Sequence, residues 1–335
     1  MVYTKSEIIE KGKVIVIGSG NWGATLATLF SKKNKVYLWT IDQAEADQLN
    51  QTRRFQIFPD QNINDNINVE KKFSRSIDKN DIVIIAIPSR KIIELIDEFI
   101  GHEYDDCIIL NASKGVKHST LMTVGQNFIS RMPKIKFATL SGPTIATELM
   151  NGQPAKAVLA SKNVSLLLHL QDILNNDLLK FEFSRDIKGV ELAGSLKGII
   201  AIAAGISDGL GFKSNITGLI LTYGLREFDN VMKFLGVKSA TVYGIAGMGD
   251  LVTTCISENS RNRKFGKLLA TGYGLNKALE KVGMEVEGVS MAKTVQKLAK
   301  FNLSIPLISC ITRIIFEDVK DIRKELLDTI NSITV

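Results

Sequence analysis

The chain has 335 residues, which is too long for one compact core and about right for two domains. Its 45% hydrophobic and 23% charged residues are those of an ordinary soluble globular protein. The formal net charge of +7 is compatible with nucleic acid, a membrane surface or anionic small molecules as partners. The basic residues are scattered, and the aromatic residues, only 7% of the chain, do not interleave with them. A phosphate-bearing substrate and cofactor therefore explain the charge at least as well as nucleic acid does.

Cysteine and histidine usage gives no sign of a disulfide framework or a metal site. The three cysteines are odd in number, far apart, and form no C-x-x-C motif, which favours a reducing compartment. The three histidines share no metal-ligand spacing, and we interpret them as surface or capping residues. These six residues are Cys107, Cys255, Cys310, His102, His118 and His169.

The N-terminus is charged and lacks the apolar core of a signal peptide. The longest apolar stretch near the middle, Gly198 to Ile206, has nine residues, far short of the ~20 needed to span a bilayer. We therefore expect a cytoplasmic protein without stable membrane insertion.

A glycine-rich turn follows the first predicted strand. The β-branched run Val14 to Ile17 leads directly into Gly18, Gly20 and Gly23, and the residues after Gly23 have a helical pattern. A G-x-G-x-x-G motif between a buried strand and a helix is typical of dinucleotide binding. Gly18 permits the tight turn, Gly20 leaves room for a pyrophosphate, and Gly23 lets helix and strand pack closely. The free N–H groups of the helix would then face the phosphates. The alternative is a strand-to-helix turn without a ligand.

The second predicted strand, Lys35 to Trp39, leaves the choice between NAD and NADP open. An NAD-preferring unit places an acidic residue about twenty residues after the first glycine, on the ribose hydroxyls. Here Thr40 is neutral and Asp42 is slightly late. Arg53 and Arg54 follow in a loop, where they could meet a 2′-phosphate or simply be solvated.

The rest of the first half alternates strands with helices, which predicts a Rossmann-type doubly wound parallel sheet of the α/β class. An Asn- and Asp-rich segment, 60–68, is predicted to be a loop. Ligands of such sheets bind beyond the carboxyl ends of the strands. Lys114 and the turn 141–144 should therefore flank the same crevice as the glycine turn. The further strands are predicted at 81–87, 107–110, 137–140 and 155–160, with a helix at 90–99.

The pattern becomes helical near Ile187, which predicts a dinucleotide-binding domain over 1–187 and an all-helical, substrate-binding and catalytic domain over 188–335. The first helix of the second half, 191–205, is rich in small residues, so we expect it to be buried and closely packed. Such helices also make a homodimer plausible. Further helices are predicted at 219–235, 265–270, 275–281, 291–300 and 306–318.

Lys197 lies inside the apolar run A-G-S-L-K-G-I-I-A-I-A-A-G. A lysine buried there would be costly unless it is paired. Its free pKa is about 10.4, and burial or a second cation, for which Lys114 is a candidate, can lower it to roughly 7–8, where it exchanges protons. Alternatively, Lys197 lies at a helix edge and extends to water. The residues alone favour neither interpretation.

Two polar segments follow in the second half. A glycine-rich turn over 246–254 presents Asp250, which is otherwise interpreted as a turn-stabilising aspartate. The S-R-N-R segment, Ser260 to Arg263, supplies hydroxyl, guanidinium and amide groups in one loop, and these groups bind phosphate. Taken alone, S-R-N-R is better interpreted as a solvated loop with a helix cap.

Together, the motifs resemble those of the bacterial NAD(P)-dependent glycerol-3-phosphate dehydrogenases over nearly the whole chain. The specificity of the resemblance lies in the order of the blocks, since no single block is decisive. The blocks are G-S-G-N-W-G at Gly18, S-K-G at Ser113, S-G-P-T-I-A at Ser141, E-L-A-G-S-L-K at Glu191, D-G-L-G-F-K-S-N at Asp208, G-M-G-D-L-V-T-T-C at Gly247, S-R-N-R-K-F-G at Ser260 and V-E-G at Val286.

The resemblance implies reversible hydride transfer between NAD or NADP and C2 of sn-glycerol 3-phosphate, giving dihydroxyacetone phosphate and supplying glycerol phosphate for phospholipid synthesis. It implies that Lys197 is the general acid/base, and that Asp250 and Thr254 orient it and the substrate. It assigns Lys114 to catalysis and to contact with both substrate and cofactor. The remaining implied substrate contacts are Gly142, Thr144, Ser260, Arg261 and Asn262, and the implied cofactor contacts, besides the three glycines, are Asn21, Trp22, Ala146, Arg261 and Glu287.

The chain departs from the family pattern at three places. Many members carry arginine just after the second strand, where this chain has Thr40 and Ile41, which weakens the case for a strong NADP preference. Thr144 replaces a frequent serine but keeps the hydroxyl, and Gly198 replaces a frequent asparagine.

Two other functions stay open at this point. One is a related two-domain β-hydroxyacid or sugar-acid dehydrogenase, and the other is a non-catalytic dinucleotide-binding regulator. The regulator would not need Lys114, Lys197, Asp250 and Arg261 together. The dehydrogenase hypothesis expects an ammonium from the helical half to meet a nicotinamide held by the N-terminal half.

Overall fold

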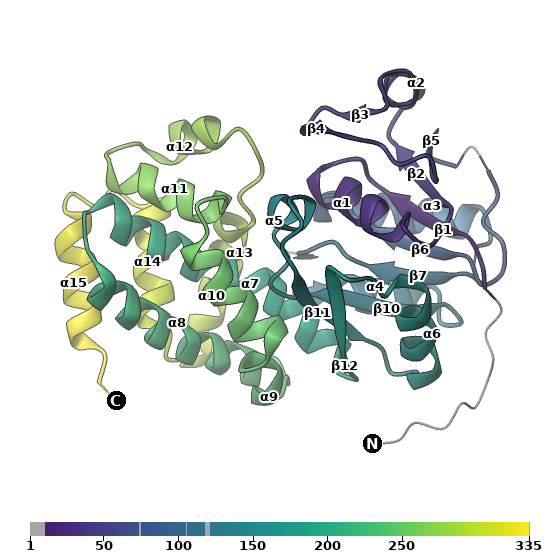
Figure 1. Cartoon of the computed structure of the whole chain (residues 1–335). Helices are drawn as coiled ribbons and strands as arrows, with labels where there is room; N and C mark the ends of the chain where they lie inside the picture. Colours follow the sequence, from purple (N-terminus) through teal and green to yellow (C-terminus); the bar gives the residue numbers. More distant parts are fainter. Residues whose placement is uncertain (1–10, 74, 105, 118–120, 335) are drawn as a thin grey trace. The chain divides into compact units, whose positions relative to one another are not determined.

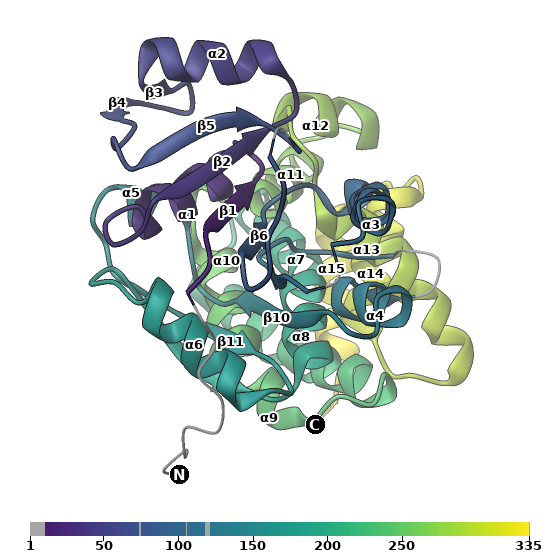
Figure 2. The ribbon, with the colours of Figure 1, turned by 90° about the vertical axis from the view of Figure 1, so that its right-hand side faces the viewer.

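The structure is a computed structural model that describes residues 11–73, 75–104, 106–117 and 121–334, so His118 lies outside the described residues. The chain forms two compact units (Figures 1 and 2). Unit 1 comprises Met1–Lys114 and Met122–Glu191, and unit 2 comprises Gly115–Leu121 and Leu192–Val335. The domain division at 187/188 that we predict from the sequence stays a prediction.

Among the described residues of unit 1, eight strands form one sheet in the order β12-β11-β10-β7-β6-β1-β2-β5. The six strands from β5 to β10 are parallel, and the strand order reverses beside β1, as in a Rossmann fold. The strands are β1 (Val14–Ile17), β2 (Val36–Thr40), β5 (Ile67–Lys71), β6 (Ile82–Ile85), β7 (Ile108–Asn111), β10 (Lys136–Ser141), β11 (Ala155–Ala160) and β12 (Leu179–Ser184). Shorter strands are β3 (Arg54–Phe55), β4 (Phe58–Asn62), β8 (Val116–Lys117) and β9 (Met122–Thr123).

The central strands align at their carboxyl ends. Ile17 of β1 pairs with Trp39 of β2 and with Ile85 of β6, and Ile85 in turn pairs with Asn111 of β7. All residues of β1 and β6 are buried, as expected for a parallel sheet that is covered on both faces. The loops that follow these strands therefore leave the sheet along one edge.

Three details of the sheet differ from the sequence-based prediction. The predicted strand at 155–160 forms, but β11 runs antiparallel to β10, because their connection carries only a five-residue helix and the chain turns back. The predicted loop at 60–68 contains the end of β4 and the start of β5, since Ile63 and Ile67 are buried. Strand β12 was not predicted, although L-K-F-E-F-S alternates apolar and polar residues.

The helices of unit 1 cover this sheet. Helix α1 packs on β1 and β2, α2 packs on β5, and α4 and α6 pack on β10. The predicted helix at 90–99 is a short 3₁₀ turn followed by α3. The elements are α1 (Asn21–Phe30), α2 (Gln43–Thr52), η1 (Ser89–Lys91), α3 (Ile92–Gly101), α4 (Val124–Arg131), α5 (Ala146–Met150) and α6 (Val164–Leu174).

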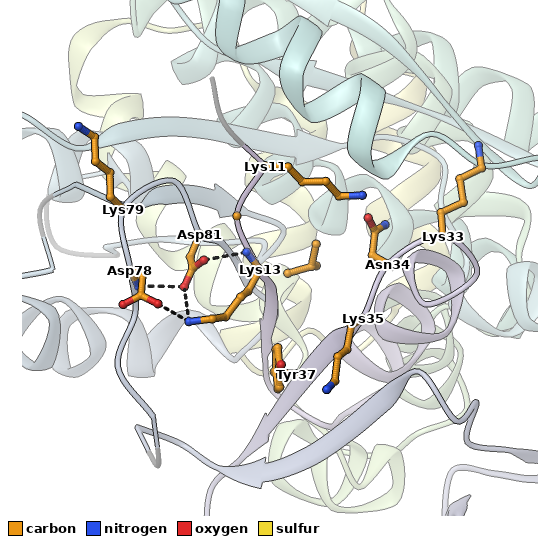
Figure 3. Close-up of a pocket in the computed structure, with 11 residues that line it drawn as sticks. Lys11, Lys13, Lys33, Asn34, Lys35, Tyr37, Asp78, Lys79 and Asp81 are labelled. Atoms are coloured by element: carbon orange, nitrogen blue, oxygen red, sulfur yellow. Dashed lines mark hydrogen bonds and ion pairs between the residues drawn. The ribbon is translucent and has the colours of Figure 1, made fainter. Parts of the chain in front are cut away.

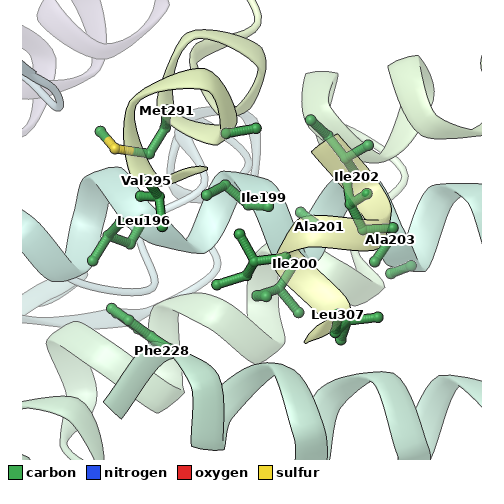
Figure 4. Packing of buried hydrophobic residues seen from close by; sticks show 14 of the residues in the cluster. Leu196, Ile199, Ile200, Ala201, Ile202, Ala203, Phe228, Met291, Val295 and Leu307 are labelled. Atoms are coloured by element: carbon green, nitrogen blue, oxygen red, sulfur yellow. The ribbon is translucent and has the colours of Figure 1, made fainter. Parts of the chain in front are cut away.

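The described part of unit 2 is helical apart from β8. Its core surrounds α7, whose isoleucines belong to the same buried cluster as Phe228 of α8, Met291 of α13 and Leu307 of α14 (Figure 4). The elements are α7 (Ile187–Gly209), α8 (Ser214–Phe234), α9 (Ser239–Val242), η2 (Ile245–Gly249), α10 (Asp250–Ile256), α11 (Arg261–Ala270), α12 (Leu275–Val282), α13 (Glu287–Gln296), η3 (Lys297–Phe301), α14 (Pro306–Phe316) and α15 (Ile322–Ser332), the last of which was not predicted.

Small residues let α7 and α11 touch at their backbones. A Cβ on Gly205 would lie 2.0 Å from the carbonyl oxygen of Arg263, and one on Gly266 would lie 2.1 Å from that of Ile202. Of the described helices, α7 alone is long and apolar enough to cross a membrane, yet its most apolar window, with mean hydropathy 1.5, is wholly buried within the chain. The nine-residue count underestimated this helix because Lys197 interrupts it. Helix α7 is thus the core helix that the small-residue pattern predicted.

Lysines that are scattered in the sequence gather at the opposite edge of the unit 1 sheet, beside the amino ends of β1 and β2 (Figure 3). They line a hollow of about 580 Å³. Lys13 pairs with Asp78 and Asp81, and its hydrogen bond to Asp78 raises the pKa of Lys13. The buried carboxylate of Asp81 also accepts the backbone N–H of Lys13 at 2.7 Å, which fixes the start of β1. The five lysines are Lys11, Lys13, Lys33, Lys35 and Lys79.

A buried carboxylate gives unit 2 a pH-dependent stability. Glu227 of α8 accepts the backbone N–H groups of Leu307 and Ile308 at 2.7 and 2.8 Å, and burial raises its pKa from 4.5 to about 7. The folded chain therefore keeps a proton that the unfolded chain releases, so the stabilisation is complete below pH 4.5 and is lost as the pH rises to about 7. We expect this group to lower the free energy of unfolding by about 3 kcal/mol across that window.

Denaturant unfolding at several pH values between 4.5 and 8 checks this expectation against Glu227→Gln, which cannot ionise. The variant should lose most of the pH dependence that Glu227 contributes. If the free energy of unfolding changed with pH equally in the two proteins, the assignment would be contradicted.

Candidate functional site

Two of the three glycines in the turn of unit 1 are required by close contacts with neighbouring backbone. Gly18 has φ +112°, its N–H donates to the carbonyl oxygen of Trp39 at 2.9 Å, and a Cβ on it would lie 2.4 Å from the carbonyl oxygen of Ala86. A Cβ on Gly23 would lie 1.8 Å from the carbonyl oxygen of Gly18. A larger residue at position 23 would force helix α1 away from the end of strand β1, and one at position 18 would press on the segment that follows strand β6.

The third glycine borders open space. Gly20 precedes α1, and no described atom lies within 4 Å of where its Cβ would be. Within the described residues, no side chain caps the N-terminus of α1, no acidic residue lies in its first turn, and Asn21 is exposed. This helix end therefore offers N–H groups and a positive dipole to an anion such as a pyrophosphate.

The loop that carries Lys114 is held beside this turn, within unit 1. Trp22 Nε1 of α1 donates to the carbonyl oxygen of Ala112 at 3.0 Å. Ser113 Oγ accepts the N–H of Ile87 at 3.0 Å and donates to the carbonyl oxygen of Ile85 at 3.2 Å. Lys114, which is partly exposed, therefore follows a loop tied to both α1 and the carboxyl end of β6.

The S-G-P-T turn leaves the same edge of the sheet, because β10 is the parallel neighbour of β7. Gly142 has φ +148°, Thr144 Oγ1 donates to the carbonyl oxygen of Gly142 at 3.2 Å, and Ala146 begins α5. The sheet order thus brings the three predicted unit 1 segments to one edge.

The residues considered for cofactor choice have local partners. Asp42 caps α2 by accepting the N–H of Glu45 at 2.8 Å. The Arg53 guanidinium donates to three carbonyl oxygens, those of Ile63, Asn64 and Ile67, so it holds its own loop together. Glu45, which the sequence did not single out, accepts a hydrogen bond from Ser19 of the glycine turn. Helix α2 therefore presents a carboxylate to this turn.

Glu191 also escaped the sequence-based choice of site residues, although it opens the E-L-A-G-S-L-K motif. In unit 1 its buried carboxylate accepts Asn111 Nδ2 at 2.7 Å and the N–H of Gly125 at 2.9 Å, and burial raises its pKa. A charged residue inside an apolar helix was the sequence signal that could have identified Glu191. The contacts fix the first turns of α7.

In unit 2, Lys197 is 6% exposed and paired, which excludes the helix-edge interpretation. Its Nζ donates to Asp250 and, at 2.7 Å, to Thr254 Oγ1. Asp250 is 2% exposed and begins α10 after the π-helical turn η2, so the expected open turn is instead a helix start. Because Asp250 and Thr254 are one helical turn apart, they present a carboxylate and a hydroxyl to the same ammonium.

The S-R-N-R segment is the start of α11 rather than a loop. Ser260 caps the helix by accepting the N–H of Arg263 at 3.2 Å, as the helix-cap alternative expects. Arg263 donates through Nε to Asp208 at 2.5 Å and so has a structural role. Arg261 is exposed and forms no ion pair with the described part of the chain. Its guanidinium lies at a helix N-terminus, a combination suited to phosphate.

Lys197 and the start of α11 lie next to each other along α7. Asn262 Oδ1 accepts the N–H of Gly288 in the first turn of α13 at 3.0 Å. A Cβ on Gly198, the residue after Lys197, would lie 3.2 Å from Asn262 Nδ2. Glu287, a predicted cofactor contact, is the first residue of α13 and is partly exposed. Unit 2 therefore gathers an acid/base candidate and phosphate donors.

Two family models, curated relatives and a solved structure point to one family. Models of the N-terminus and C-terminus of NAD-dependent glycerol-3-phosphate dehydrogenase match residues 13–167 and 186–324. Glycerol-3-phosphate dehydrogenase [NAD(P)+] of Fusobacterium nucleatum is 36% identical over 91% of this chain and 93% of its own length. The enzyme of that name from Oceanobacillus iheyensis is 35% identical over 94% of each chain. The crystal structure of glycerol-3-phosphate dehydrogenase from Coxiella burnetii superposes with a TM-score of 0.86 at 29% identity, over 96% of this chain and 98% of that one.

Proposed function

Because the chain belongs to the family of NAD-dependent glycerol-3-phosphate dehydrogenases, we propose that it transfers hydride reversibly between a nicotinamide cofactor and C2 of sn-glycerol 3-phosphate. Family membership makes it an NAD(P)-dependent oxidoreductase that acts on a CH–OH group and takes a small phosphate-bearing substrate. The observation that carries the detailed proposal is the buried Lys197–Asp250–Thr254 cluster.

Lys197 is the proposed general acid/base. When dihydroxyacetone phosphate is reduced, negative charge develops on the C2 oxygen, and a nearby ammonium stabilises it and donates a proton. In the oxidation direction the neutral amine takes that proton from the hydroxyl. Asp250 and Thr254 hold the lysine nitrogen in place through the contacts described above. Lys114 is a proposed second contact to substrate and cofactor.

The proposed cofactor site uses the uncapped start of α1. Nicotinamide cofactors supply and accept the hydride. The open space at Gly20 and the free helix end fit the pyrophosphate, with Gly18 and Gly23 shaping the turn. The remaining proposed cofactor contacts are Asn21, Trp22, Lys114, Ala146, Arg261 and Glu287. The proposal takes either NAD or NADP as the cofactor.

The proposed phosphate site is the start of α11. Arg261 offers a planar fork of donors, Asn262 an amide, and Ser260 lies beside them. Gly142 and Thr144 are proposed substrate contacts from unit 1. Binding energy from the non-reacting phosphate then positions C2 for hydride transfer. We further propose a cytoplasmic homodimer without membrane insertion, whose product feeds phospholipid synthesis.

A spectrophotometric assay tests the function. Oxidation of NADH and of NADPH is followed in parallel with dihydroxyacetone phosphate and with β-keto acids as substrates. We expect turnover with dihydroxyacetone phosphate and little with the keto acids. The reverse preference would replace the proposal with the related β-hydroxyacid dehydrogenase, and no turnover with either would favour the dinucleotide-binding regulator.

A further inference from the structure

We infer that Gly288 is a positioning residue for phosphate recognition: its backbone N–H orients the amide of Asn262 so that the NH₂ end is kept for the substrate phosphate. The inference rests on the proposed function and assigns a role to a residue outside the site predicted from the sequence. All groups involved belong to unit 2.

The orientation follows from the chemistry of the hydrogen bond. A backbone N–H can only donate, so the end of the Asn262 amide that faces Gly288 at 3.0 Å must be the oxygen. The NH₂ end is then turned toward α7, where it lies 3.2 Å from the Cβ position of Gly198. Without this bond the amide could rotate by half a turn and present its oxygen to an anion, which repels it.

Two glycines make room for this arrangement. A Cβ on Gly288 would lie 2.6 Å from Asn262 Oδ1 and 2.7 Å from the carbonyl carbon and oxygen of Gly198. A Cβ on Gly198 would lie 3.0 Å from the Cα of Gly288. Neither glycine is among those with positive φ, so close approach, rather than backbone conformation, requires them. Helices α7 and α13 thus meet backbone to backbone, with the Asn262 amide beside the contact.

The same contact gives a reason for the glycine at position 198. A side chain there would press on both the start of α13 and the NH₂ group of Asn262. Because Gly198 has no side chain, the backbone of Gly288 can approach it closely. The contact between Gly198 and Gly288 therefore positions the Asn262 amide, whereas Lys197 Nζ is held separately by Asp250 and Thr254.

The decisive experiment measures steady-state kinetics of Gly288→Ala with dihydroxyacetone phosphate and with dihydroxyacetone, which lacks the phosphate. The added methyl group displaces the Asn262 amide, so we expect KM for dihydroxyacetone phosphate to rise about 10- to 100-fold, as for the loss of a hydrogen bond to a charged group. Because the reacting carbons are the same, kcat/KM for dihydroxyacetone should stay within about twofold. A purely structural defect would lower kcat/KM for both substrates alike, and that result would overturn the inference.

Three further variants sharpen the result. Gly218→Ala is the matched control, since Gly218 also lies in a helix but no described atom is within 4 Å of its Cβ position. Gly198→Ala replaces Gly288→Ala if that variant does not fold, because its contacts of 3.0–3.2 Å are milder. It should raise KM for dihydroxyacetone phosphate a few-fold. In an Asn262→Ala background, Gly288→Ala should cause no further rise in that KM. An additional rise there would show that Gly288 does not act through Asn262.

The outcome also separates this inference from the proposed function. If Arg261→Ala loses the preference for the phosphorylated substrate but Gly288→Ala keeps it, the phosphate site stands and the positioning role falls. If the unmodified enzyme does not prefer dihydroxyacetone phosphate to dihydroxyacetone, the proposed function itself fails.

Discussion

Replacing Lys197 with alanine is expected to lower kcat for dihydroxyacetone phosphate reduction by about 10²- to 10⁴-fold, the usual contribution of a positioned general acid. The variant loses both the proton donor and the positive charge beside the developing alkoxide. Binding of reduced cofactor, followed by nicotinamide fluorescence, should change little, because the proposed pyrophosphate site is the glycine turn of unit 1. Undiminished turnover would refute the role given to Lys197.

A control must separate lost chemistry from lost stability, because Lys197 is the ion-pair partner of Asp250. Its carboxylate is 2% exposed, and removing Lys197 leaves that charge buried without its main partner, at a cost of ~3–5 kcal/mol. The double variant Lys197→Met/Asp250→Asn removes both charges and should unfold at a higher temperature than Lys197→Ala while remaining as inactive. Recovery of activity in the double variant would mean that lost folding, rather than lost chemistry, explains the single one.

Replacing Arg261 with alanine is expected to raise KM for dihydroxyacetone phosphate by about 10- to 100-fold, with a smaller effect on kcat. Arg261 is exposed at the start of α11 and forms no ion pair with the described residues, so its loss should leave stability nearly unchanged. Steady-state kinetics together with thermal unfolding check both expectations. An unchanged KM would place the phosphate site elsewhere.

Two variants frame the Arg261 result. Arg261→Lys keeps the charge but loses the planar fork, so its KM should lie between those of the unmodified enzyme and the alanine variant. Arg263→Ala breaks the ion pair with Asp208, and should lower stability more than substrate affinity. If the two alanine variants behaved alike, S-R-N-R would be a structural helix start without a specific phosphate ligand.

Short-range patterns in the sequence determined much of unit 1. The apolar runs gave the buried strands β1, β2, β6, β7 and β10 within one or two residues, because a parallel sheet covered on both faces needs continuous apolar strands. The G-x-G-x-x-G spacing predicted the turn, since a Cβ on Gly23 would lie 1.8 Å from the carbonyl oxygen of Gly18, five residues earlier in the same motif. The close contact of Gly18 with Ala86 depends instead on the pairing of β1 with β6. Small residues in α7 likewise predicted close packing against a neighbouring helix, and the structure shows that this neighbour is α11.

Only the tertiary structure decided which residues meet across long sequence separations. Asp250 and Lys197 are each ambiguous alone, and only the packing of α10 against α7 makes them a buried pair. The structure also separated Arg263, tied to Asp208, from the exposed Arg261, and reversed the direction of β11. The physical reason is the same in each case. Helical and strand periods are local properties of the chain, whereas a hydrogen-bond partner or a strand direction depends on how distant elements pack.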